Sequence, residues 1–202
     1  MKKSENYKII FHLTNIKNFA DILKSGLLPR SKLNIDFFDV ADGKILDLRR
    51  EYKLNDLIPF HFFPTNPFAG KIQQTYPEDD FMFLTLNKKF IESRMHNFYI
   101  IPSHPLHLHK NESQILYNFT DGIKKIDWDT MNSRDFNNQK CKQICMAECL
   151  TNLSIDINDF DSITVKNLNV KKEILNTLSL YNEEYGYDIN IYVNVEPAWF
   201  KK

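Results

Sequence analysis

A histidine and a threonine lie two residues apart near the start of the chain, inside the β-prone stretch Tyr7–Thr14. Alternate residues of a strand point to the same face, so His12 and Thr14 would present an imidazole and a hydroxyl side by side. Taken alone, a histidine in an apolar strand either packs in the core or serves a site. These residues leave both interpretations open.

A lone carboxylate follows an apolar, helix-prone segment. Glu148 precedes Cys149 and Leu150, which predicts that it begins a strand inside the fold. Burying a carboxylate is costly unless a partner pairs with it or the chemistry uses it. The alternative is a strand residue that faces solvent. Arg49 and Arg50 lie in a polar stretch, where they read as a solvated pair.

Three further histidines form the pattern HxxHxH at His104, His107 and His109. His107 and His109 would share a face in an extended segment, as metal ligands can. No carboxylate or histidine follows nearby as a further anchor, so we expect no metal. His61 lies in the aromatic segment Pro59–Phe63, which reads as core packing but could also stack a base where it ends.

Cys141, Cys145 and Cys149 are spaced four apart, which would align them on one stripe of a helix. An odd, clustered number of cysteines does not indicate a disulfide framework. The stripe therefore predicts small buried side chains in a reduced, cytoplasmic environment.

Length and composition limit the classes of protein. The chain has 202 residues, equal numbers of acidic and basic residues and only five glycines, and it contains neither GxGxxG nor GxxxxGK[ST]. This argues against a Rossmann site and a P-loop. No apolar run is long enough to span a membrane, no secretory signal is visible, and we expect one domain over residues 1–202. The neutrality is a sum of opposed ends: residues 1–35 carry seven Lys/Arg and two Asp/Glu, whereas residues 151–202 carry five and eight.

The order of strand-like and helix-like segments predicts a mixed α+β fold, because it lacks a regular βαβ alternation. A helix is expected over Ile16–Ser25, ended by Gly26, with others near 87–95, 133–147 with Ser133 as N-cap, and 170–181. Strands are expected at 7–14, 57–63, 81–86, 98–102, 163–165 and 188–195, and loops at 64–70 and 103–133.

Six segments in order resemble the DarT family, toxins that ADP-ribosylate DNA bases and use NAD. They are Phe11–Phe19 with its HxT pattern, Ile22–Leu28, Ile58–Phe62, Phe119–Gly122 followed by Ile126–Trp128, Lys142–Leu150 with its KxxxAE pattern, and Val193–Phe200. Each segment is short, but their common order spans nearly the whole chain. The resemblance implies an ADP-ribosyltransferase-like mixed fold with a central split β-sheet flanked by helices.

The same resemblance implies roles for residues. Glu148 would stabilise the oxocarbenium-like transition state as the bond between nicotinamide and ribose breaks. Arg49 or Arg50 would neutralise the diphosphate or steer the target base. The remaining expected NAD contacts are His12, Thr14, Asn18 and Gly26.

The loop after the second strand departs from the family pattern. Pro64–Phe68 lacks the family's arginine, and His61 stands where the family has tyrosine. We therefore expect His61, Thr65 and Asn66 to influence the choice of base, with guanine or an RNA target as alternatives to thymine. The implied partners are single-stranded DNA and a macrodomain antitoxin of the DarG type. The alternatives are an RNA or protein acceptor, or a non-catalytic nucleic-acid-binding module.

Overall fold

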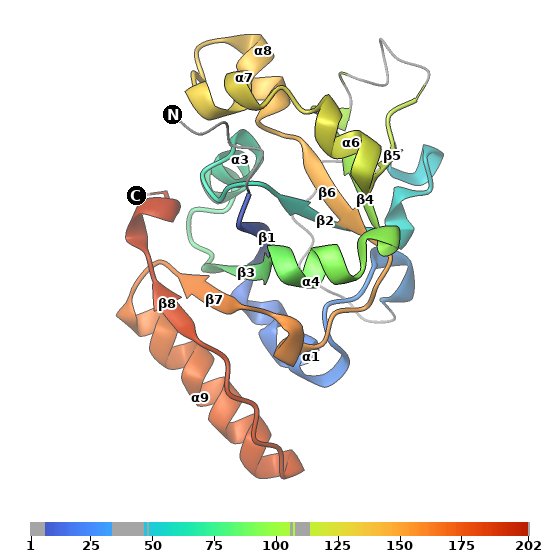
Figure 1. Cartoon of the computed structure of the whole chain (residues 1–202). Coiled ribbons are helices and arrows are strands. Elements are labelled where there is room, and N and C mark those ends of the chain that lie inside the picture. Colours follow the sequence, from blue (N-terminus) through green and yellow to red (C-terminus); the bar gives the residue numbers. More distant parts are fainter. Residues whose placement is uncertain (1–6, 34–46, 48, 106, 108–113, 202) are drawn as a thin grey trace.

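An eight-stranded sheet runs through the computed structural model, which describes residues 7–33, 47, 49–105, 107 and 114–201 (Figure 1). The strands lie in the order β5-β4-β6-β2-β1-β3-β7-β8. Their bounds are β1 Ile9–Asn15, β2 Ile58–His61, β3 Phe81–Asn87, β4 Phe98–Ile101, β5 Tyr117–Asn118, β6 Glu148–Thr151, β7 Ser162–Val165 and β8 Val193–Val195. Neighbouring strands pair antiparallel except β7 and β8, which are parallel because a long helix connects them.

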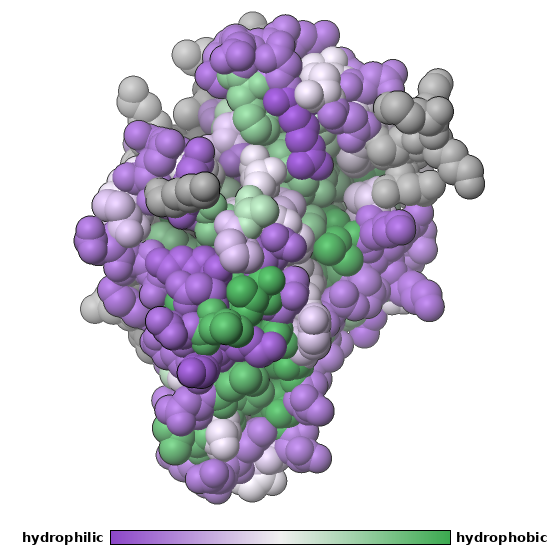
Figure 2. All heavy atoms as spheres, turned by 90° about the vertical axis from the view of Figure 1, so that its left-hand side faces the viewer, coloured by the Kyte–Doolittle hydropathy of each residue, from purple (hydrophilic) through white to green (hydrophobic). Residues whose placement is uncertain are grey.

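Helices flank this sheet, which confirms the predicted mixed α+β class. Their bounds are α1 Phe19–Ser25, α3 Pro67–Thr75, α4 Lys88–Ser93, α6 Phe119–Lys125, α7 Trp128–Ser133, α8 Gln139–Ile144 and α9 Leu168–Tyr185. Within the described ranges, none of the helices combines the length and apolar character needed to cross a bilayer. Figure 2, seen from the left of Figure 1, shows a mostly hydrophilic upper part and hydrophobic patches toward the end where α9 and β8 lie.

Strand β1 is buried on both faces because its side chains alternate between two apolar clusters. Ile10 belongs to the larger cluster, together with residues of α1 and α9 such as Phe19 and Ile174. Phe11 and Leu13 belong to a smaller cluster that includes residues of α3, β3 and the C-terminal segment. This double burial holds β1 rigidly at the centre of the sheet.

The sheet is continuous, but its pairing is shortest between β1 and β2. These strands register at one pair, Phe11 opposite His61, whereas β1 and β3 register along the whole length of β1. Beside that pair, the His12 Nδ1 lies 2.8 Å from the Pro59 carbonyl oxygen. A side chain thus bridges the strands where the ladder of backbone bonds ends. The split predicted for the sheet is located at this junction.

The predicted loop at 64–70 is wrong in its second half, because α3 begins at Pro67. The Asn66 side chain accepts a hydrogen bond from the Ala69 amide, and proline occupies the first turn, where its missing N–H costs nothing. Asn followed by Pro is a helix-start signal that also resembles a turn. The loop-rich reading of 103–133 missed β5, α6 and α7.

Two other expected elements are shorter than predicted. Ser133 ends α7 instead of starting a helix, Arg134 adopts a left-handed conformation, and α8 begins after Asn138, whose side chain caps it. The strictly alternating segment 188–195 forms a strand only at Val193–Val195. The helix predicted at 170–181 extends to Tyr185, where Gly186 ends it.

Candidate active site

A pocket of about 200 Å³ opens at the split between β1 and β2. Its polar lining residues come from distant parts of the chain and are His12, Thr14, Asn18, Asp21, Ser25, Arg30, Arg49, His61, His104 and Glu148. Apolar side chains of α1 and of the segment after it, including Ile22 and Leu27, complete the wall. The fold therefore brings most of the predicted site residues together.

Glu148 is the first residue of β6 and lies between two strands, paired with His61 of β2 and Ile101 of β4. Its exposed fraction is 7%. The Glu148 Oε2 accepts a hydrogen bond from the Arg49 Nη1 at 3.1 Å, which forms a buried ion pair. The prediction that Glu148 begins an internal strand is confirmed, and its alternative, a solvent-facing residue, is excluded.

Arg49 is held by backbone as well as by the carboxylate. Its Nη2 donates to the carbonyl oxygens of Leu54 at 3.3 Å and Leu57 at 3.1 Å, and its exposed fraction is 5%. A planar guanidinium held by two carbonyls therefore restricts the orientation of the Glu148 carboxylate that it contacts. Arg50 has a different position: it is exposed, it pairs with Asp47, and it is not among the lining residues. Of the two adjacent arginines, the structure therefore places only Arg49 in the pocket.

His12 lines the pocket from β1. Because a carbonyl only accepts hydrogen bonds, the contact with Pro59 requires a proton on Nδ1 and leaves Nε2 as an acceptor in the neutral ring. Burial lowers the pKa of His12 to about 4, although the bond to Pro59 acts in the opposite direction. At neutral pH His12 is thus an uncharged side chain with a fixed tautomer.

Thr14 and Asn18 form a polar pair beside His12. The Asn18 Nδ2 donates to the Thr14 Oγ1 at 3.0 Å, and both residues line the pocket. Gly26 ends α1 with φ of 74°, and a Cβ at this position would lie 2.6 Å from the Ile155 carbonyl oxygen. Leu27 and Ile155 exchange two backbone hydrogen bonds, so this turn fixes the pocket wall.

Two more histidines surround Glu148. The His61 Nδ1 lies 3.1 Å from the Ala147 carbonyl oxygen, and the His61 ring packs against Phe68. Burial lowers the pKa of both His61 and His104, while the Glu148 carboxylate acts to raise them. Sequence reasoning missed His104 as a pocket residue, because its HxxHxH pattern was considered only as a possible metal site.

Arg30 adds positive charge to the same pocket. Its pKa lies below the usual value, first because it is half-buried and second because Arg49 is close. Arg49 and Glu148 offset each other's charge and Asp21 also lines the pocket, so the positive charge is local to the arginine side chains, which suits charge-assisted hydrogen bonds to an anionic group. The basic character of the N-terminal end was visible in the sequence, but the meeting of Arg30 with Arg49 was not.

Thr65 and Asn66, predicted to influence base choice, do not line this pocket. Asn66 is buried with both polar ends engaged, since its Nδ2 donates to Phe63 and its Oδ1 caps α3. Asn66 thus has a structural role in starting α3, and its expected influence on the choice of base stays a prediction. Thr65 lies at the rim of a second concave surface.

Among the described residues, no group of three His, Cys, Asp or Glu side chains could hold a metal ion. His109 lies outside the described residues. The three cysteines are buried, but Cys149 belongs to β6, so the predicted helical stripe holds only for Cys141 and Cys145.

A carboxylate held by an arginine, next to neutral hydrogen-bonding groups, suits reactions that develop positive charge on a sugar carbon. An anionic side chain already fixed in a water-poor site needs no reorganisation when the charge appears. Apolar walls and nearby arginines provide room for a ligand that is part apolar and part anionic.

Comparisons with known proteins agree with this chemistry. The family model described as "ssDNA thymidine ADP-ribosyltransferase, DarT" matches residues 11–201. A search of curated proteins finds no match. Among solved structures, Thermus sp. 2.9 DarT in complex with ADP-ribosylated ssDNA aligns with a TM-score of 0.76, 17% identity and 96% of each chain covered.

Two other solved structures are similar. Thermus sp. 2.9 DarT in complex with NAD+ aligns with a TM-score of 0.73 and 16% identity, over 97% of this chain and 98% of the other. Thermosipho africanus DarTG in complex with ADP-ribose aligns with a TM-score of 0.69 and 19% identity, over 96% of this chain and 51% of the other. These likenesses confirm the expected ADP-ribosyltransferase fold. With 191 of its residues inside the family model, the chain belongs to the DarT family of single-stranded DNA ADP-ribosyltransferases.

Proposed function

We propose that this protein transfers ADP-ribose from NAD to a nucleobase of single-stranded DNA at the pocket around Glu148. The observation that carries the proposal is the buried Arg49–Glu148 pair at the split of the sheet, in a chain that matches the DarT family model. In the reaction, the bond between ribose and nicotinamide breaks and nicotinamide leaves with its electron pair. A base nitrogen then bonds to the same ribose carbon and loses its proton.

Glu148 acts at two points of this reaction. Its carboxylate stabilises the positive charge that spreads over the ribose as nicotinamide leaves. It also accepts the proton of the attacking base nitrogen, or a hydrogen bond from the ribose 2′-hydroxyl. Arg49 keeps this carboxylate in a single orientation and is a positioning residue for it.

The remaining polar groups of the pocket hold NAD as a substrate. His12 offers Nε2 as an acceptor to a ribose hydroxyl, and the Thr14–Asn18 pair offers a hydroxyl and an amide beside it. Arg30 and Arg49 supply the positive charge that a diphosphate requires. Ile22 and Leu27 provide apolar surface for a planar base. Gly26 keeps this wall in place.

The protein acts as a single catalytic domain and, in this proposal, as a cytoplasmic toxin antagonised by a macrodomain antitoxin of the DarG type. Its similarity to about half of the Thermosipho africanus DarTG chain supports the pairing with such a partner. The family description names thymidine as acceptor, while the Pro64–Phe68 loop differs from the family pattern. Labelling of oligonucleotides that differ at one base therefore identifies the accepted base directly.

The test is incubation of the protein with labelled NAD and, separately, single-stranded DNA, RNA or a mixture of proteins. We expect label on single-stranded DNA and no label when Glu148→Gln replaces the wild type. Label on RNA or protein alone would move the acceptor to that class. Binding of DNA with no label on any acceptor would favour a non-catalytic binding module.

A further inference from the structure

A second concave surface, the aromatic groove, lies beside the pocket. It has a volume of about 530 Å³ and is formed by the N-terminal end of the described chain, the loop after β2, the α7 region and the C-terminal segment. The residues that matter for its chemistry are Lys8, Phe63, Thr65, Trp128, Arg134 and Trp199. In Figure 1 these segments gather on the left side, between the N-terminus, α7 and the C-terminus.

The groove combines aromatic surface with positive charge. Its rings include two tryptophans and its exposed rim carries Lys8 and Arg134, while none of the described residues that line it is Asp or Glu. In a chain with no net charge, such a local excess of cations over anions favours an anionic partner. Aromatic side chains with a nearby arginine are typical of surfaces on which unpaired bases stack.

Arg134 is held in a costly backbone conformation at the rim of the groove. Its φ is 48°, a left-handed value that a residue with a Cβ adopts at an energetic cost. This turn carries the guanidinium over the Phe63 ring, with 4.2 Å to its centroid, and the Arg134 Nη1 donates to the Thr65 Oγ1 at 3.5 Å. The planar group is exposed and already fixed on the loop after β2.

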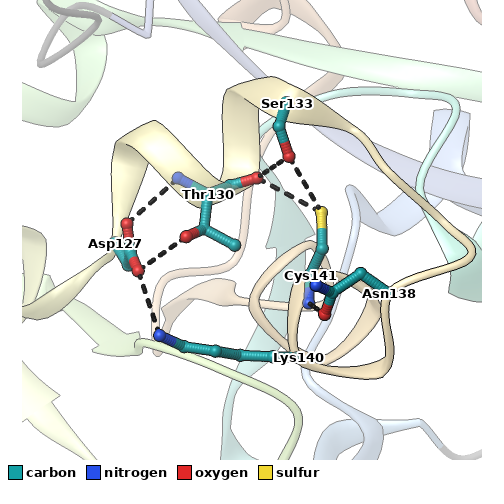
Figure 3. Close-up of polar contacts among 6 residues, drawn as sticks. All are labelled: Asp127, Thr130, Ser133, Asn138, Lys140 and Cys141. Carbon is teal, nitrogen blue, oxygen red and sulfur yellow. Dashed lines mark hydrogen bonds and ion pairs between the residues drawn. The ribbon is translucent and has the colours of Figure 1, made fainter.

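The turn that carries Arg134 is anchored on both sides. Figure 3 shows α7 and α8 joined by the Cys141 Sγ, which donates to the Thr130 carbonyl at 3.2 Å and lies 3.5 Å from the Ser133 Oγ. A second contact also joins α8 to the start of α7: the Lys140 Nζ lies 3.7 Å from the Asp127 Oδ2. These contacts fix the turn, so Arg134 does not need ordering when a ligand arrives.

The groove continues directly from the candidate pocket along the chain. His61 is the last residue of β2 and lines the pocket, while the next four residues, from Phe62 to Thr65, line the groove. Strand β1 also contributes to both, but Phe11 and His12 are adjacent and point to opposite faces of the strand, so the link between pocket and groove is the loop after β2. A polymer held at Glu148 by one unit reaches the groove with a neighbouring unit along this loop.

We propose that the aromatic groove binds a nucleotide next to the modified base of single-stranded DNA, whose base stacks on the Arg134 guanidinium. This inference rests on the proposed function for the identity of the polymer. A duplex buries the faces of its bases, whereas a single strand presents them. The groove therefore supplies a physical reason for a single-stranded substrate that the pocket alone does not supply.

The test is binding of a fluorescent single-stranded oligonucleotide of about ten nucleotides, measured by anisotropy without NAD. Asparagine tolerates a left-handed backbone, so Arg134→Asn removes the guanidinium and keeps the turn. We expect this variant to raise the Kd for the oligonucleotide about tenfold, the size of one lost base stack. The variant keeps its Tm and NAD affinity. Arg134→Lys retains the charge but has no planar surface, so we expect its Kd to lie between those of the wild type and Arg134→Asn.

The matched control is Arg94→Asn, because the Arg94 guanidinium stacks 4.1 Å from the Phe90 ring centroid outside the groove. It loses the same charge and the same kind of contact, and we expect its Kd to equal that of the wild type. The proposal is overturned if Arg134→Asn binds as tightly as the wild type, if Arg94→Asn weakens binding equally, or if the wild type binds no oligonucleotide. Binding that depends on Arg134, with no base ever labelled, would keep the groove and reject the proposed function.

Discussion

The candidate pocket and the aromatic groove are neighbours, yet they hold their cations in opposite ways. Arg49 is 5% exposed, fixed by two carbonyls and paired with a carboxylate. Arg134 is exposed, and in the contacts described above it touches an aromatic ring and a hydroxyl. This difference in exposure matches two tasks: bond breaking requires a buried side chain held in one orientation, whereas capture of a flexible strand requires accessible surface.

The largest effect is expected when the pocket loses its cation. Arg49→Met leaves Glu148 as a buried charge without its partner, which costs about 3–5 kcal/mol of unfolding free energy. For a chain of this length that lowers the Tm by roughly 10 °C. Arg50→Met is the adjacent control: its exposed pair with Asp47 predicts a change within about 0.5 kcal/mol. Equal melting temperatures for the two variants would show that the buried Arg49 pair contributes no more to stability than the exposed Arg50 pair.

A second effect follows from the neutral histidine of the pocket. The pKa of His12 falls from 6.5 in the unfolded chain to about 4 in the folded protein, so the unfolded state binds more protons between these values. The stability that His12 contributes is complete above pH 6.5 and is lost as the pH falls to 4, at a cost of about 3 kcal/mol. We expect His12→Gln, which cannot protonate, to lose less stability over this range. Titration of the His12 ring near pH 6.5 by NMR would contradict this.

The wall of the pocket gives a smaller effect. Gly26→Ala adds a Cβ that meets the Ile155 carbonyl oxygen at 2.6 Å in a left-handed backbone, and we expect a loss of about 1–3 kcal/mol with a raised KM for NAD. Gly186→Ala is the control, because its φ is also positive but no atom lies within 4 Å of the added carbon. Denaturant unfolding separates the two. Similar losses would show that the contact with Ile155 has no special cost.

The smallest effect concerns the groove. Thr65→Arg places a second guanidinium beside Arg134, and we expect a several-fold change in the preference between oligonucleotides, because stacking strength differs among bases. The KM for NAD stays unchanged, since Thr65 does not line the pocket. Competition between oligonucleotides that differ at one base measures this preference. An unchanged preference would remove the loop from the account of specificity.

The sequence predicted the pocket better than its surroundings. The apolar patterns predicted the strands of Glu148 and His12 but left open whether each side chain lies in a site, and only the resemblance to the DarT family assigned them to one. Arg49 and Arg50 both lie in helical backbone and were not separable from the sequence, because adjacent residues of a helix differ only in direction and tertiary packing decides which one is buried. His104 was missed because its HxxHxH pattern pointed to a metal site, whereas its place in the pocket depends on a contact distant in sequence, the bond from its amide to the Gln143 carbonyl of α8.

The groove was largely invisible in the sequence. Asn66 and Pro67 begin α3 but read as a turn, and Arg134 interrupts what looked like one helix from 133 to 147. A left-handed arginine has no signature in a single sequence, since glycine or asparagine is the usual residue there. The joining of the N-terminal end, α7 and the C-terminal segment depends on contacts distant in sequence.

The most direct test of the central claim, that Glu148 carries the transfer, is a single-turnover assay with labelled NAD and single-stranded DNA. Glu148→Gln preserves the size of the side chain and an acceptor for Arg49 but removes the negative charge. We expect a loss of label on DNA of at least about 100-fold, with a retained fold and NAD affinity, and a lowered Tm because Arg49 keeps its charge without a counterion. Labelling at the wild-type rate would contradict it, and unfolding of the variant would show that Glu148 is a structural carboxylate.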